Sequence, residues 1–316
     1  MGEGSDPERH HYLPKFYIER WAKAKGELIR FAPTPRGEVR YKYASPKAAG
    51  FAFRLYETPG VDPEDAQALE TNLLQLVDAR GAEALRIFLS EQPEPLGHSW
   101  RSDWSRFLMS LLYRTPANLE TAKSTVAAMW RQSAEERERQ YQEIRHDGAP
   151  ATFEDYLAST DPHLVEKLAL DIIARGMENA TVGGILNNLH WCVLGPEAGS
   201  PSLLTSDEPI RMTEGLGRSD GYLTIPLGPD RLCIGTYERG YLTTLLRDGP
   251  TELFVRSNEH VIEQASSQVI AANLDHAELI SARFGKGERR NLVGIIAEAV
   301  HRDDAATESR PPSEIP

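Results

Sequence analysis

The residues best suited to chemistry lie in short polar segments that are far apart in the chain. His10 and His11 are adjacent and precede a Leu-Pro step, Arg114 precedes Thr-Pro, and Asp207 lies within Thr-Ser-Asp-Glu-Pro. Histidine titrates near neutral pH and readily takes a carboxylate partner, whereas arginine binds phosphate or carboxylate bidentately. The set therefore predicts a site with a histidine as base or ligand, Asp207 as orienter or ligand, and Arg114 as anion clamp.

Other polar side chains accompany these segments. The candidates for binding a substrate are Tyr12, Tyr17, Ser206 and Asn258. The histidines come just ahead of a predicted helix that begins near Pro14, and backbone N–H groups at a helix N-terminus favour anions. Glu70 lies on a mostly apolar stripe and needs a partner if it is buried. Arg114 is one candidate for that partner.

Each segment also has a purely structural interpretation. Ser206 and Asp207 can satisfy nearby backbone N–H groups in a turn that Pro209 stiffens. Arg114 can close a salt bridge inside the fold, and Asn258 can be a local capping residue. The histidines can hydrogen-bond backbone carbonyls. The sequence leaves both interpretations open.

Composition narrows the class of protein. The chain has 316 residues, 40% of them hydrophobic and 26% charged, which is ordinary for a soluble protein with a large core. A formal net charge of −12 argues against passive nucleic-acid binding, which needs a clustered positive surface. Cys192 and Cys233 are expected to be buried, reduced thiols. No apolar run approaches the roughly 18 residues of a membrane span, and the N-terminus resembles no signal peptide, so we expect a cytoplasmic protein.

The N-terminal half contains a hairpin and then a helical block. The spacing predicts a helix over 14–24, strands over 27–31 and 39–43, and a connector over 44–61. Helices are expected from about 62 to 189, among them 100–113 and one from 116 to about 145. The second half of that long helix is almost entirely polar, with alternating charges, as is typical of a solvated helix face.

The C-terminal half changes to short β-rich segments. Strands are predicted over 191–194, 202–205, 222–225 and 231–236, followed by a helix over 251–272 and a strand over 279–284. These elements predict a single α+β domain over 10–285, with a helical subdomain at about 62–189. Its sheet is expected to be one mixed or antiparallel sheet built from N-terminal and C-terminal strands. Residues 1–9 and 302–316 are expected to be disordered.

Several motifs in this order resemble the uncharacterised, mainly bacterial domain-of-unknown-function family 4238. They are HHYLPKFYIERW at the N-terminus, then RTP, LTSDEP, IPLGP and SNEHVIEQA. The resemblance spans about residues 10–285 and falls on His10, His11, Tyr12, Pro14, Phe16, Tyr17, Arg114, Pro116, Ser206, Asp207, Pro209, Pro226, Leu227, Pro229 and Asn258. Glu208 stands where the family usually has Asn, so the resemblance gives position 208 no active-site role. It implies no established activity.

The leading hypothesis is a hydrolase that acts on a phosphate ester or nucleic acid through His10, His11, Asp207 and Arg114. The alternative is a non-catalytic protein that binds a ligand or a protein and acts in regulation. The cofactor is left open, with a divalent metal allowed, and the sequence indicates no membrane partner and no extended basic surface. Oligomeric state is also left open. No GxSxG, HExxH or P-loop motif accompanies the histidines.

Overall fold

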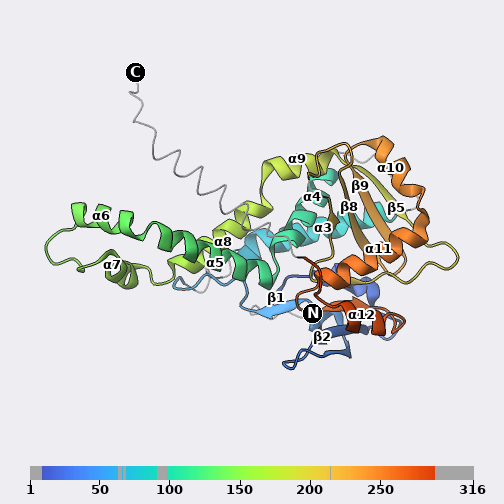
Figure 1. Cartoon of the computed structure of the whole chain (residues 1–316), viewed down its shortest axis with the longest axis horizontal. Helices are drawn as coiled ribbons and strands as arrows, with labels where there is room; N and C mark the ends of the chain where they lie inside the picture. The colour runs from blue at the N-terminus through green and yellow to red at the C-terminus, as the bar shows by residue number, and fades with distance from the viewer. Residues whose placement is uncertain (1–8, 63–65, 67–68, 91–97, 214, 289–316) are drawn as a thin grey trace, which may run out of the picture.

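The computed structural model describes residues 9–62, 66, 69–90, 98–213 and 215–288. Its described part is a mixed α+β fold in which helices predominate, as the sequence predicts. Most strands gather at one end of an elongated molecule, and helices extend away from them toward the other end (Figure 1). The expected disorder of 1–9 and 302–316 falls almost entirely outside the described residues.

The strands form three antiparallel groups rather than the single sheet predicted from the sequence. A ribbon joins β1 (Arg9–His11) to β4 (Phe51–Phe53), and one four-stranded sheet has the order β3-β2-β10-β6. The other has the order β5-β9-β8-β7. The prediction was wrong because the C-terminal strands divide: β10 and β6 pair with the N-terminal hairpin, while β8 and β9 pair with β5.

The predicted N-terminal hairpin is confirmed by β2 (Leu28–Pro33) and β3 (Val39–Ala44), which pair along their whole length. The sheet continues through β10 (Val269–Ala271) and β6 (Thr205–Ser206). The remaining strands are β5 (His190–Leu194), β7 (Arg211–Met212), β8 (Tyr222–Gly228) and β9 (Arg231–Thr236).

The segment that carries the histidines is organised differently from the prediction. His10 and His11 lie in β1, which pairs with a strand inside the predicted connector. The predicted 14–24 helix is shorter and consists of α1 (Lys15–Ile18) and the 3-10 helix η1 (Glu19–Trp21). Its aromatic side chains are buried: the Trp21 indole N–H donates to the Leu203 carbonyl (2.8 Å), and the Tyr17 hydroxyl donates to the Pro226 carbonyl (2.8 Å). This short helical segment therefore joins both four-stranded sheets.

The helical block begins with a π-helical turn, η3 (Leu69–Leu74), and continues as α3 (Gln75–Phe88) and α4 (His98–Tyr113). Next come α5 (Pro116–Gln132), α6 (Ala134–Ile144), α7 (Phe153–Thr160), α8 (Leu164–Met177) and α9 (Ala180–Asn188). The Thr115 hydroxyl accepts the Asn118 N–H (3.2 Å), so Thr115 caps α5 and Pro116 starts it, as predicted.

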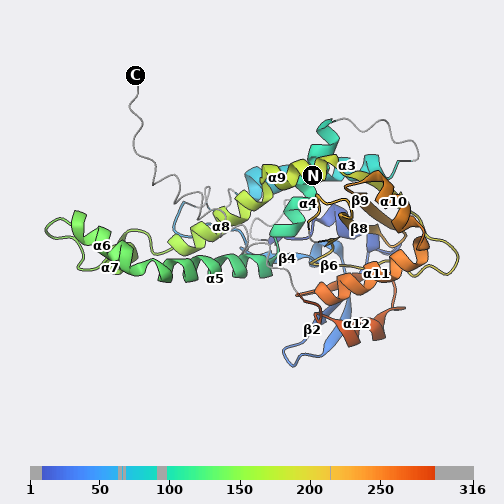
Figure 2. The same ribbon diagram turned by 45° about the horizontal axis from the view of Figure 1, so that its top comes forward.

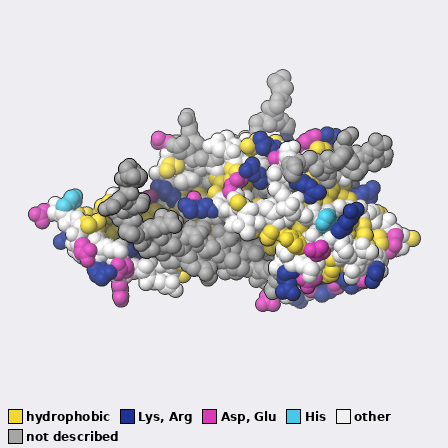
Figure 3. All heavy atoms as spheres, turned by 90° about the horizontal axis from the view of Figure 1, so that it is seen from above, with side chains coloured by type: hydrophobic (Ala, Val, Ile, Leu, Met, Phe, Trp, Pro, Cys, Tyr) yellow, Lys and Arg dark blue, Asp and Glu magenta, His cyan; other side chains and the backbone are white. Residues whose placement is uncertain are grey.

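Helices α5 to α8 form an arm that projects from the rest of the molecule, with α6 and α7 at its tip (Figure 2). On the face shown in Figure 3, acidic and basic side chains are mixed over this arm. Ion pairs such as Arg139–Glu136 (2.5 Å) link neighbouring turns of α6. The polar second half of the predicted long helix is therefore a solvated face, although Ser133 separates α5 from α6.

Two predictions near the C-terminus were wrong. The helix predicted over 251–272 is α11 (Gly249–Gln264), because the backbone N–H groups of 266–268 turn toward a carboxylate instead of continuing the helix. The strand predicted over 279–284 is α12 (Ala277–Arg283), where Ile280 is buried against the neighbouring core. Short apolar runs fit either a strand or a helix, and packing decides between them. A further helix, α10 (Arg239–Leu246), precedes α11.

Candidate functional site

Strand β1 and the residue after it supply three neighbouring side chains to three different environments. His10 is fully buried, and its Nδ1 accepts the Tyr56 backbone N–H (2.8 Å). Its ring also stacks on the Tyr56 ring, with 5.5 Å between centroids and 5° between planes. These contacts fix the chain around Tyr56, which is the structural role of a histidine rather than a catalytic one. The catalytic role of His10 stays a prediction.

His11 lies on the opposite side of the ribbon from His10 and contacts the Phe51 ring at 5.9 Å between centroids. Its Nε2 is buried and has no hydrogen-bond partner among the described residues. Burial lowers the pKa of His11, and the positive charges of Arg114 and Arg9 lower it further. His11 is therefore a neutral imidazole at pH 7, with one nitrogen available for a proton or a ligand.

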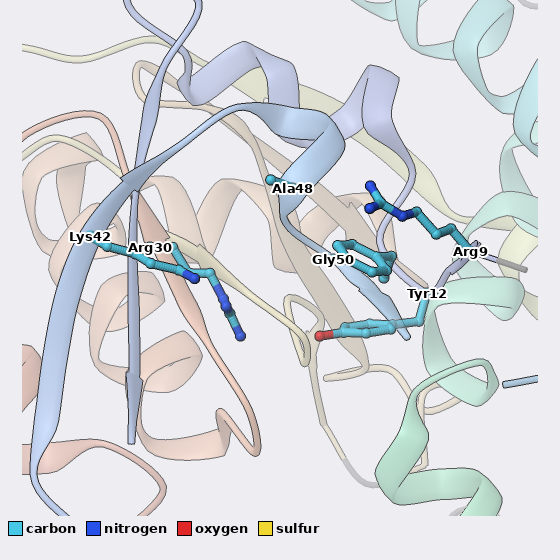
Figure 4. Close-up of a pocket in the computed structure, with 7 residues that line it drawn as sticks. Arg9, Tyr12, Arg30, Lys42, Ala48 and Gly50 are labelled. Atoms are coloured by element: carbon cyan, nitrogen blue, oxygen red, sulfur yellow. The ribbon is translucent and has the colours of Figure 1, made fainter. Parts of the chain in front are cut away.

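Tyr12 faces a pocket of about 280 Å³ that lies beside the ribbon. Its lining residues come from β1 and the residue after it, from β2 and β3, and from the segment that leads into β4 together with the first residue of β4: Arg9, Tyr12, Arg30, Lys42, Ala48, Gly50 and Phe51. Arg30 and Lys42 reach the pocket from one side and Arg9 from the other, and the Tyr12 hydroxyl is directed toward Arg30 (Figure 4). The lining thus contains three cationic side chains and no carboxylate, in a protein whose net charge is −12.

The backbone at Gly50 is part of this construction. Gly50 has a φ of 68° and its carbonyl accepts the Leu13 N–H (3.0 Å). A Cβ at this position would lie 2.7 Å from the Leu13 Cβ, so any other residue would push the turn away from the segment that carries Tyr12. Glycine is therefore required for the close approach of these two parts of the wall.

A chain of hydrogen bonds holds the pocket wall in place from behind. The buried Gln268 side chain donates from Nε2 to the Tyr12 hydroxyl (3.0 Å) and accepts at Oε1 from Arg30 Nε (2.7 Å). The Tyr12 hydroxyl also contacts Ser267 Oγ (3.2 Å). Burial raises the pKa of Tyr12 to about 12, so its hydroxyl keeps its proton at neutral pH.

Asp207 anchors the far end of this chain. Its carboxylate accepts the backbone N–H groups of Ser266 (3.2 Å), Ser267 (2.8 Å) and Gln268 (3.2 Å), and also the hydroxyls of both serines. Three backbone donors and two hydroxyls occupy the lone pairs of the carboxylate. Asp207 therefore fixes the turn between α11 and β10, and its predicted role as histidine orienter or metal ligand gains no support from these contacts.

The other predicted substrate-binding residues lie inside the fold. Ser206 accepts the Glu208 N–H (3.2 Å) in a local turn, which is the structural interpretation left open by the sequence. Asn258 accepts the Leu204 N–H (2.8 Å) and donates to the Ser202 carbonyl (2.9 Å), so it ties α11 to the chain before β6. Tyr17 is fully buried. Of the four predicted residues, Tyr12 is the one that lines the pocket.

Arg114 belongs to a second, buried polar cluster. It is fully buried, and its Nη1 donates to Asp78 Oδ1 (2.7 Å). Its Nε and Nη2 have no partner among the described residues, and Tyr56 donates its hydroxyl to the Arg114 carbonyl. The internal salt bridge anticipated as an alternative is thus present, with Asp78 rather than Glu70 as the hydrogen-bonded acid.

Glu70 lies near this ion pair, in the π-helical turn η3. Burial raises the pKa of Glu70 to about 7, the negative charge of Asp78 raises it too, and Arg114 opposes both effects. Burial likewise raises the pKa of Asp78. Glu70 Oε2 is buried without a partner among the described residues. The cluster therefore holds more acidic groups than its single arginine can neutralise at high pH.

Sequence reasoning missed the cationic lining residues Arg9, Arg30 and Lys42 and the supporting residues Ser267 and Gln268. A partial signal for two of them was present, because the predicted hairpin contains both Arg30 and Lys42. The structure sets the register of that hairpin and places the two residues directly opposite each other. Like charges directly opposite on one face of a sheet are destabilising. The contribution of Gln268 depends on a contact 256 residues away along the chain, for which the sequence offered no signal.

Among the residues that the structure describes, no group of three or more His, Cys, Asp or Glu side chains could hold a metal ion. Cys192 and Cys233 are free thiols, partly and fully buried, as predicted. Within the same described ranges, no helix is both long and apolar enough to span a membrane.

The comparison with protein families matches residues 9–275 to a model described as "Protein of unknown function (DUF4238)". The chain belongs to this family. The match begins at β1 and ends after β10, so it covers the cationic pocket, the Asp207 turn and the Arg114 cluster. No curated protein and no solved structure matches the chain.

Proposed function

We propose that this member of the family binds a small anionic molecule, specifically one that bears a phosphate group, in the pocket beside β1. The observation that carries the proposal is the direct cross-strand pairing of Arg30 with Lys42 in the pocket wall. Two cations held opposite each other repel, and an anion bound between them converts this repulsion into attraction.

The arrangement of donors supports a phosphate group. Arginine offers paired N–H donors, lysine a mobile ammonium group, and the protonated Tyr12 hydroxyl a further polar contact. Arg30 is held by the buried Gln268, so its guanidinium is oriented before a ligand arrives. Ligand sites are usually about 300–1,000 Å³, so a pocket of about 280 Å³ suits a small molecule.

The test is calorimetric titration of the full chain with inorganic phosphate at low ionic strength. Arg30→Gln should weaken binding about tenfold or more, because a hydrogen bond to a charged group contributes about 1.5–3 kcal/mol. Arg40→Gln is the matched control, since Arg40 belongs to the same hairpin but pairs with Glu38 and does not line the pocket. Equal weakening in both variants, or no binding by the native chain, would contradict the proposal.

A second candidate function is hydrolysis of a phosphate ester, and the state of His11 favours it. His11 contacts Phe51 of the pocket lining and keeps Nε2 without a partner among the described residues. A neutral imidazole beside a bound ester can accept a proton from water. This candidate mechanism does not use His10 or Asp207, because their hydrogen bonds hold other parts of the fold in place.

This candidate is tested by release of nitrophenol from p-nitrophenyl phosphate, with and without Mg²⁺ or Mn²⁺. His11→Asn should lower the turnover rate about 100-fold, the size of a lost general base. His190→Asn is the control, because His190 is an exposed histidine at the start of β5. Phosphate binding without turnover by the native chain would leave a binding protein and exclude this hydrolase activity.

A further inference from the structure

The two ends of the pocket differ in chemistry. Arg30 and Lys42 lie at one end, together with the Tyr12 hydroxyl, and Arg9 lies across from them (Figure 4). At the Arg9 end the guanidinium carbon is 4.9 Å from the centroid of the Phe51 ring and 5.6 Å from that of Phe53. One end therefore offers concentrated positive charge, and the other offers flat surfaces.

The β1–β4 ribbon creates the flat end. Its register places Arg9 opposite Phe53 and His11 opposite Phe51, so these four side chains share one face of the ribbon. A guanidinium held on aromatic rings keeps a planar orientation, and planar rings of ligands stack on arginine as well as on phenylalanine. An arginine that only attracted an anion through its charge would not need to rest on aromatic rings.

The space between the two ends is bounded by small residues. Ala48 and Gly50 are the smallest members of the lining, and they lie in the turn that leads into β4. A ligand that reaches from Arg30 to Arg9 passes beside them and beside the Tyr12 ring, which is almost completely buried and held through its hydroxyl. The passage therefore suits a flat group better than a bulky branched one.

We infer that the pocket selects a phosphate monoester whose organic part is a planar aromatic or heteroaromatic ring, the class to which nucleoside monophosphates belong. The phosphate binds between Arg30 and Lys42, and the ring stacks at the Arg9–Phe51 end. This inference rests on the proposed function, because it assigns the phosphate to the same cationic wall. It adds the identity of the group that the phosphate carries.

The test compares phenylphosphonate with ethylphosphonate, two probes that cannot be hydrolysed, by calorimetric titration of the full chain at an alkaline pH at which both probes are dianions. The native chain should bind phenylphosphonate at least about fivefold more tightly, as expected for a stacked ring. Phe51→Leu and Arg9→Lys should bring that ratio close to one, because each removes a flat surface on which the ring stacks. Arg9→Lys keeps the positive charge, so it separates stacking from electrostatic attraction.

The outcomes separate this inference from the proposed function. Equal affinity for both probes in the native chain overturns the ring selection and leaves phosphate binding intact. A phenyl preference that survives both substitutions also overturns it. If neither probe binds, the proposed function and the ring selection are overturned together. Arg9 is exposed, so Arg9→Lys remains informative even if Phe51→Leu impairs folding.

Discussion

The cationic pocket and the Arg114 cluster both contain charged residues near β1, yet they differ in almost every physical respect. In the pocket, like charges face a space of about 280 Å³, and the side chains behind them are hydrogen-bonded. In the cluster, opposite charges are packed into the core, and polar atoms of Glu70 and Arg114 have no partner among the described residues. The pocket brings like charges together around open space, whereas the cluster is arranged around its own ion pair.

The difference between the two regions shows that a shifted pKa does not by itself identify a functional site. The pKa values of Glu70 and Asp78 are both raised, and burial is the main cause in each case. Burial alone produces such shifts in structural ion pairs as well as in active sites. The pocket is identified instead by geometry, through two cations that the register forces together. We expect the cluster to stabilise the fold and the pocket to bind an anion, and each expectation can be tested separately.

The largest effect on stability is expected from Asp78→Asn. The substitution leaves Arg114 fully buried without its carboxylate, and a guanidinium cannot lose its proton at any ordinary pH. Breaking a buried ion pair in this way costs about 3–5 kcal/mol in the free energy of unfolding, measured by urea denaturation. Asp103→Asn, which removes the partly exposed pair with Arg80, should cost less than about 1 kcal/mol. Similar losses of unfolding free energy in the two variants would show that the buried Arg114–Asp78 pair stabilises the fold no more than a surface ion pair does.

Glu70 should make stability depend on pH near neutrality. Its pKa is raised to about 7 in the folded chain, so the folded state holds the proton more tightly than the unfolded state does. The resulting stabilisation is complete below the unfolded pKa, near 4.5, and is lost as the pH rises through 7. The loss should be about 1–3 kcal/mol, after allowance for partial exposure.

Glu70→Gln should flatten this profile and raise the thermal midpoint at pH 8 relative to the native chain. Thermal unfolding between pH 5 and 8 measures both chains. Glu83→Gln is the control, because Glu83 is exposed and pairs with Arg86 on the surface of α3. A native chain whose stability does not fall between pH 6 and 8 would contradict the assignment.

Asp207→Asn connects stability to the pocket. The amide has one acceptor oxygen where the carboxylate accepts from three backbone N–H groups and two hydroxyls, so the turn at 266–268 loses hydrogen bonds. We expect a loss of about 1–3 kcal/mol in unfolding free energy. Phosphate affinity should also fall, because the turn carries Ser267 and Gln268. Calorimetry of the folded variant measures that effect, and unchanged affinity would show that the pocket does not depend on this anchor.

The smallest effect is expected from Gln268→Met, which keeps the volume of the side chain and removes its hydrogen bonds to Tyr12 and Arg30. Arg30 then loses its fixed orientation, and phosphate affinity should fall about threefold to tenfold, the equivalent of about one hydrogen bond. Gln264→Met, at the C-terminal end of α11 just before the turn that carries Gln268, is the control, because Gln264 lies outside the pocket lining. Equal phosphate affinities in the two variants would show that Gln268 does not contribute to phosphate binding.

The resemblance seen in the motifs and the α+β class were correct, while the site was only partly anticipated. The HHYLPKFYIERW segment contacts both four-stranded sheets through Tyr17 and contacts Phe107 of α4, and its Tyr12 faces a pocket. Asp207, Asn258 and Tyr17 were chosen because they are polar residues in the motifs, yet their hydrogen bonds hold the scaffold. Polar residues in a family motif can stabilise the fold instead of taking part in a reaction, because buried polar groups must be hydrogen-bonded.

The sequence by itself determined the local elements: the β2–β3 hairpin, the Thr115 cap of α5 and the solvated face of α6. These depend on neighbours a few residues apart, and their propensities act locally. The tertiary structure alone decided where α11 ends, because the N–H groups of 266–268 donate to the Asp207 carboxylate instead of continuing the helix. It also decided that 277–283 is helical and that the Gln268 side chain hydrogen-bonds to Tyr12 and Arg30. Such choices follow from packing between segments more than 50 residues apart, which no local pattern encodes.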